Sequence, residues 1–120
     1  MPTIRLKRAY DAPAADDGVR ILVERLWPRG VSRERAAIDH WYKDVAPSPE
    51  LRRWYGHVAE RWPEFRRRYE AELAKNSGEV PRLRALCAGG RVTFVFAARD
   101  VERNSAVVLR DFLGQGRGRA

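Results

Sequence analysis

The chain has 120 residues, of which 44% are hydrophobic, and it carries a formal net charge of +8 at pH 7. This length suits a single core, and no apolar run approaches the roughly 20 residues that a membrane-spanning helix needs. The lone cysteine excludes a disulfide framework and a thiolate metal cluster, and with no signal-peptide core at the N-terminus we expect a cytoplasmic protein.

Four segments are predicted to be β-strands. Residues 4–9 alternate apolar and basic side chains, which is the period of a strand with one buried face. The apolar runs at 20–26 and 92–97 are typical of central strands, and a short strand is expected at 39–43. We expect the 92–97 strand in the interior of the sheet rather than at its edge.

Helices are predicted between and after these strands. A short helix is expected to begin near Arg33 with Ser32 as its cap, and another at Pro49 with Ser48 as its cap. Longer amphipathic helices are expected over 61–75, 79–88 and 104–112.

The alternation of strands and helices predicts an α/β fold. We expect a compact three-layer domain over residues 1–113, with a small, mainly parallel sheet of about four strands. Residues 114–120 are rich in glycine and arginine and are predicted to form a flexible tail. The connection between the first two strands is short for a parallel crossover.

Two of the predicted central strands end in an arginine beside a carboxylate, Glu24-Arg25 and Arg99-Asp100. In open α/β sheets, ligands bind beyond the carboxyl ends of the strands. Guanidinium groups match phosphate and carboxylate geometry, so we expect an anion-binding cleft at this edge. Its expected ligand-binding residues are Arg25, Arg29, Arg99 and Trp27, with Arg8 and Lys43 near the rim.

Glu24 and Asp100 are the candidate catalytic carboxylates, which would orient water or a hydroxyl group. We expect the neighbouring arginines to lower the pKa of both groups. The alternative is that these acids and arginines simply pair with one another and order the loops, as Arg25 with Asp100 or Arg99 with Glu24.

No cofactor or metal is expected. The chain has neither a Walker loop nor a dinucleotide fingerprint, and it has no redox or pyridoxal signature. His40 and His57 lack the spacing to acidic residues that a metal site needs, and His57 is explained as a helix C-cap. Cys87 lies on an apolar helix face and is predicted to belong to the core.

Five segments in order carry a resemblance to a known family. They are IRLKRAY at 4–10, LWPRGVS at 26–32, KDVAPS at 43–48, WYGH at 54–57 and AARD at 97–100. Over residues 4–113 the chain resembles the YeaO-like family of uncharacterised bacterial proteins, a domain of unknown function. The resemblance implies a small cytoplasmic α/β domain and brings no established activity.

The chain departs from the pattern of that family near the last helix. The family has a histidine on each side of the asparagine that opens this helix, whereas Arg103 and Ser105 flank Asn104 here. The family also has Asp-Pro after the Gly-His pair, where this chain has Val58 and Ala59. A histidine acid–base role near the last helix therefore cannot operate in this chain.

Two functions remain open at this point. The first is binding of a phosphorylated or carboxylated small molecule in the arginine-rich cleft, with hydrolysis or group transfer as the chemistry if it is an enzyme. The alternative is a nucleic-acid-binding module without catalysis, because the chain is basic. The residues that support the alternative are Arg52, Arg53, Arg66, Arg67, Arg68, Arg117 and Arg119.

Overall fold

A computed structural model describes residues 4–118 of the chain. Within them, four parallel strands form one sheet in the order β1-β4-β2-β3. All five residues of β4 are buried between β1 and β2, which confirms the prediction of an interior strand. The strands are β1 (Ile4–Arg8), β2 (Val19–Leu22), β3 (His40–Trp41) and β4 (Val92–Phe96).

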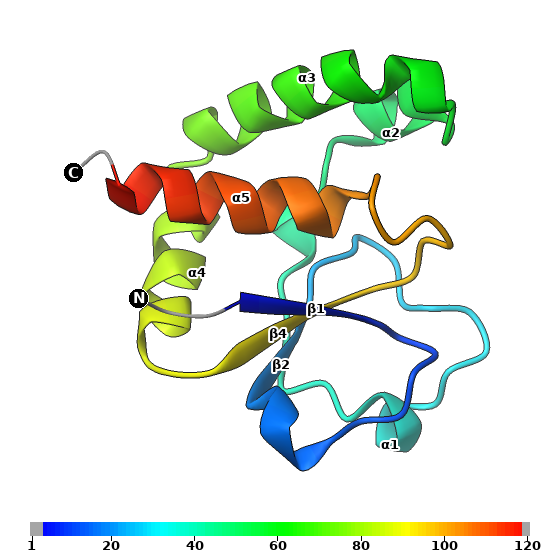
Figure 1. Cartoon of the computed structure of the whole chain (residues 1–120), viewed down its shortest axis with the longest axis vertical. Coiled ribbons are helices and arrows are strands. Elements are labelled where there is room, and N and C mark those ends of the chain that lie inside the picture. Colours follow the sequence, from blue (N-terminus) through cyan, green and yellow to red (C-terminus); the bar gives the residue numbers. More distant parts are fainter. Residues whose placement is uncertain (1–3, 119–120) are drawn as a thin grey trace.

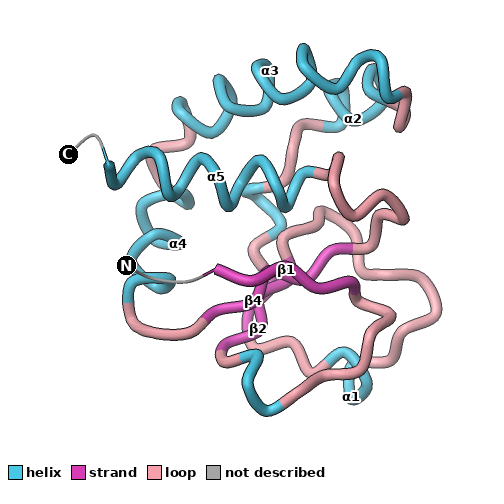
Figure 2. The backbone as a smooth tube through the Cα atoms, viewed as in Figure 1, coloured by secondary structure: helices cyan, strands magenta, loops and turns pink. Residues whose placement is uncertain are grey.

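Helices lie on both sides of this sheet, as the predicted three-layer α/β fold requires (Figure 1). Four helices cover one side: α2 (Pro49–Tyr55), α3 (Trp62–Lys75), α4 (Glu79–Ala88) and α5 (Ser105–Gly118). The other side carries only α1 (Arg33–Ala36) and a 3-10 turn at Ala15–Asp17, so loops cover most of it (Figure 2). No helix within residues 4–118 is long and apolar enough to cross a membrane.

Helices α1, α2 and α5 begin at polar side chains that cap them. The Ser32 hydroxyl accepts a hydrogen bond from the Arg35 N–H at 3.1 Å, and the Ser48 hydroxyl accepts one from the Leu51 N–H at 3.2 Å. Both caps were predicted from the sequence, because a side-chain oxygen there satisfies an otherwise unpaired N–H. Asn104 caps α5 in the same way.

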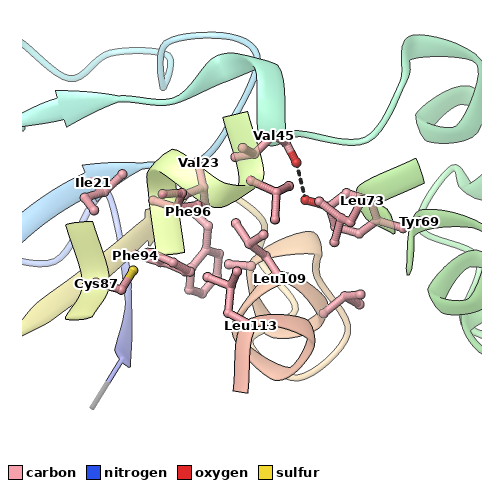
Figure 3. Close-up of a cluster of buried hydrophobic side chains, with 14 of the residues drawn as sticks. Ile21, Val23, Val45, Tyr69, Leu73, Cys87, Phe94, Phe96, Leu109 and Leu113 are labelled. Atoms are coloured by element: carbon pink, nitrogen blue, oxygen red, sulfur yellow. Dashed lines mark hydrogen bonds between the residues drawn. The ribbon is translucent and has the colours of Figure 1, made fainter. Parts of the chain in front are cut away.

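The main core lies between the sheet and helices α3, α4 and α5 (Figure 3). Alternate residues of β2 and β4, such as Ile21 and Phe94, point into it, as the two-residue period of a strand dictates. The Tyr69 hydroxyl crosses this core and donates a hydrogen bond to the Val45 carbonyl. Cys87 is buried there, and burial raises the pKa of its thiol to about 11, which confirms it as a core residue.

The opposite face of the sheet is polar at one end. Arg20 and Asp17 are 4% and 1% exposed, and Arg20 Nη1 lies 2.6 Å from Asp17 Oδ2. Lys7 of β1 also reaches Asp17, with its Nζ 3.2 Å from Oδ1. At the other end of this face a smaller apolar cluster packs Leu22 against Trp41 and their neighbours.

Three predicted boundaries differ from the structure. β2 ends at Leu22 rather than at residue 26, and β3 has only two residues. The Glu24 carbonyl accepts its hydrogen bond from the Trp41 side chain, where a longer β2–β3 pair would use a backbone N–H. Helix α5 continues to Gly118, into the segment predicted as a tail. Residues 119–120 of that predicted tail lie outside the described part.

Substitution of Gly18, at the turn into β2, tests how closely the β1–β2 connection packs against the backbone of Arg91. Its φ is +67°, and a Cβ there would lie 2.2 Å from the Arg91 carbonyl oxygen, which accepts the Val19 N–H. Gly30 has φ +79° with nothing within 4 Å, so Gly30→Ala is a matched control that meets backbone strain alone. We expect Gly30→Ala to lower the free energy of unfolding by about 1–2 kcal/mol and Gly18→Ala by clearly more. Equal losses in urea unfolding would contradict the close approach.

Candidate functional site: a basic pocket at the carboxyl ends of β2 and β4

A pocket of about 480 Å³ opens at the edge of the sheet where β2 and β4 end. This volume lies in the range of small-molecule sites. The segments that follow the two strands and the start of α5 form one part of its wall, and α2 and the turn after it form another. The polar side chains that line it are Glu24, Arg25, Arg52, Arg53, Tyr55, His57, Asn104 and Ser105.

Glu24 is the acid of this pocket. Its backbone carbonyl accepts a hydrogen bond from Trp41 Nε1 at 2.7 Å, which fixes the chain where it leaves β2. Burial raises the pKa of the Glu24 carboxyl, and the Ala97 N–H and the charges of Arg52 and His57 offset this only in part. The predicted lowering of this pKa is therefore wrong, because desolvation outweighs the basic neighbours.

Arg25 lies beside Glu24 and is about 30% exposed. Its Nη2 donates a long hydrogen bond of 3.4 Å to the Ala46 carbonyl, and its Nη1 lies 3.9 Å from Asp44. Its Nε is buried without a hydrogen-bond partner. A buried unpaired donor destabilises a fold by roughly 1–3 kcal/mol, so the position of Arg25 is not optimised for stability.

Arg52 and Arg53 bring positive charge to the pocket from α2, and His57 lines it from the turn that follows. All three side chains are exposed. His57 has φ +60°, a left-handed conformation that is uncommon outside glycine and that concentrates at functional sites. Sequence reasoning missed this group as part of the cleft. The available signal was two arginines one turn before the Gly-His pair of the WYGH segment.

Three other residues that were expected at the cleft have different partners. Trp27 donates its Nε1–H to the Val31 carbonyl at 2.7 Å and packs edge-on against Trp41. The Lys43 ammonium lies 4.5 Å from the centre of the Trp41 ring. Arg8 Nε donates a hydrogen bond to the Ala98 carbonyl at 3.0 Å, so Arg8 stabilises the wall of the pocket.

Arg29, Arg99 and Asp100 are also absent from the pocket lining. Arg29 and Arg99 are exposed. Asp100 accepts the backbone N–H groups of Glu102 and Arg103, which lower its pKa as predicted, although these N–H groups rather than cleft arginines are the main cause. Its side chain pairs with Arg103 at 3.3 Å and so orders a loop, but neither of the pairs named in the alternative, Arg25 with Asp100 or Arg99 with Glu24, is among the ion pairs of the described residues.

Metal-binding chemistry has no support in the described residues. Within 4–118, no three histidine, cysteine, aspartate or glutamate side chains gather closely enough to hold an ion.

Comparison with known proteins places this chain in a family. The chain belongs to the family described as the inactive DUF488-N3 subclade, whose model matches residues 3–119. An uncharacterised protein of Mycobacterium tuberculosis is 44% identical over 110 residues, 92% of each chain. The uncharacterised protein YeaO of Escherichia coli is 41% identical over 111 residues, 92% of this chain and 96% of that one, which confirms the resemblance read from the sequence. No solved structure gives a significant match.

The raised pKa of Glu24 predicts a pH-dependent effect of Glu24→Gln on stability. A raised pKa in the folded state contributes stability that is complete below the ordinary pKa and is lost as pH rises through the raised value. Glutamine has no such dependence. We therefore expect Glu24→Gln to be more stable than the native chain at pH 7, and this advantage to shrink towards pH 4.

Urea unfolding at both pH values measures the difference. Glu60→Gln, at an exposed position outside the pocket lining, controls for the change in net charge. A difference between Glu24→Gln and the native chain that is constant with pH would contradict the burial of this carboxyl.

Proposed function

We propose that the pocket binds a small phosphorylated or carboxylated molecule. The observation that carries this proposal is the presence of Arg25, Arg52, Arg53 and His57 around one cavity of small-molecule size. A net positive charge in a concave site attracts anions and binds them through charge-assisted hydrogen bonds.

The start of α5 adds to this positive field. Asn104 and Ser105 line the pocket, and α5 runs for 14 residues behind them. The N-terminus of a helix carries partial positive charge and free N–H groups, which favour a negative ligand. The Asn104 side chain accepts the Val107 N–H at 3.1 Å and so holds the first turn in place.

We further propose that the pocket binds its ligand without turnover. The subclade to which the chain belongs is described as inactive. Arg103 and Ser105 stand where the resemblance implies histidines, so no imidazole flanks Asn104, the residue that caps α5. The sequence leaves hydrolysis and group transfer open, but a binding role accounts for these observations more simply.

The nucleic-acid alternative has less support. Arg66 pairs with Asp111 at 2.8 Å, and Arg67 and Arg68 both pair with Glu64, so this helix face offers little free positive charge. The side chains of Arg117 and Arg119 lie outside the described residues. A steep loss of DNA or RNA affinity with salt would be the sign of backbone-driven binding.

Arginine substitutions test whether the pocket is the site. Inorganic phosphate is the probe, and isothermal titration calorimetry is the measurement. We expect Arg52→Gln and Arg53→Gln each to weaken phosphate binding by about tenfold, the equivalent of ~1.4 kcal/mol for one lost contact. Arg99→Gln and Arg29→Gln, exposed and outside the lining, should stay within about twofold.

The same set of variants contains the contradictory outcome. Loss of binding in Arg99→Gln with none in Arg52→Gln would move the site out of the pocket. No phosphate binding at millimolar concentration by the native chain would leave the proposal without support.

His57→Gly tests whether the backbone at position 57, in the wall of the pocket, is strained. Glycine adopts φ near +60° without the steric cost of a Cβ, so we expect a gain of about 1 kcal/mol in the free energy of unfolding. Phosphate binding should weaken because a hydrogen-bonding side chain of the pocket lining is removed. His40→Gly, in the extended backbone of β3, should lower stability instead. A loss of stability in His57→Gly would contradict the strain.

A further inference from the structure

We infer that the pocket selects anions that also carry a hydrogen-bond donor, a hydroxyl or amino group, and that the Glu24 carboxylate accepts this donor. The inference rests on the proposed function, since it gives the same ligand a second contact. The ligand is then a small molecule that carries both an acidic group and a hydrogen-bond donor.

The charged side chains of the pocket differ in exposure. Arg52 and Arg53 are exposed, whereas Glu24 and Arg25 are half-buried where the chain leaves β2. All four line the same pocket, so the Glu24 carboxyl and the arginines border one space. A ligand in this space can contact the arginines with its acidic group and the Glu24 carboxylate with another group.

The Glu24 carboxylate has hydrogen-bonding capacity left. A carboxylate offers about four acceptor positions, and the Ala97 N–H lies close enough to the Glu24 carboxyl to lower its pKa. Among residues 4–118, none of the ion pairs ends on Glu24, although three arginines line the same pocket. Arg25 turns instead towards Asp44 and the Ala46 carbonyl.

A carboxylate in this position opposes simple anions. Phosphate near an ionised Glu24 is repelled, and the half-buried setting screens this repulsion less than bulk water does. A ligand that presents a hydroxyl or amino group to Glu24 replaces the repulsion with a hydrogen bond while its acidic group stays with the arginines. The pocket therefore combines attraction for one end of a ligand with discrimination at the other.

Three alkyl phosphates of nearly equal size test the inference. Propyl phosphate has no donor at its far end, 2-hydroxyethyl phosphate has a neutral one, and phosphoethanolamine has a charged one. Calorimetric titration of the native chain should give the weakest binding for propyl phosphate and binding at least about tenfold tighter for phosphoethanolamine, as expected for one charge-assisted hydrogen bond. This comparison needs no variant.

Glu24→Gln then assigns the preference to one side chain. We expect phosphoethanolamine and propyl phosphate to bind this variant within about threefold of each other, with propyl phosphate bound at least as tightly as by the native chain. Glu60→Gln, with the same change in net charge at an exposed position outside the lining, should keep the native preference.

The outcomes separate the two proposals. Equal binding of all three phosphates by the native chain, with dependence on Arg52, would overturn the donor preference and leave anion binding intact. A preference that persists in Glu24→Gln would overturn the role of Glu24. Failure of all three probes and of inorganic phosphate to bind would overturn both proposals.

Discussion

The buried pair of Asp17 and Arg20 is the constraint on which the rest of the structure depends. Only ten residues, 9–18, connect β1 to β2 across the face of β4, and this connection contains no α-helix. The Arg20 guanidinium bonds to Asp17 and to the Ala36 carbonyl, and Lys7 closes the network from β1. Removing one partner of such a pair leaves a buried charge and costs about 3–5 kcal/mol, so the network specifies one path for the crossover.

This network also explains where the pocket lies. It holds the first half of β2 against β4, and the chain then leaves the sheet at Val23 towards Glu24. The indole of Trp41 fixes that exit through the Glu24 carbonyl, while Arg8 holds the facing wall through the Ala98 carbonyl. The scaffold thus fixes the backbone around the acid, and exposed arginines of α2 supply positive charge beside it.

The sequence predicts the architecture better than it predicts the members of the site. Period-two patterns and serine caps identify strands and helices because they depend on neighbours along the chain. The location of the site at one edge of the sheet follows from strand direction, and it makes Glu24 and Arg25 expected site residues. The sequence offers Arg52 and Arg53 only as candidate nucleic-acid contacts, because their place beside the pocket depends on how α2 packs, a contact between distant segments that no local pattern encodes.

Amide chemical shifts of 15N-labelled protein, followed by NMR during titration with inorganic phosphate, test the central claim of an anion site at this edge. The amides expected to move lie at 24–25, 52–57, 97–98 and 104–105, where the lining segments of the pocket meet. The predicted result is that the shifts are confined to these segments and that all of them follow one binding curve with a single Kd. Shifts clustered at the paired arginines of 66–68, with the pocket amides unmoved, would contradict it.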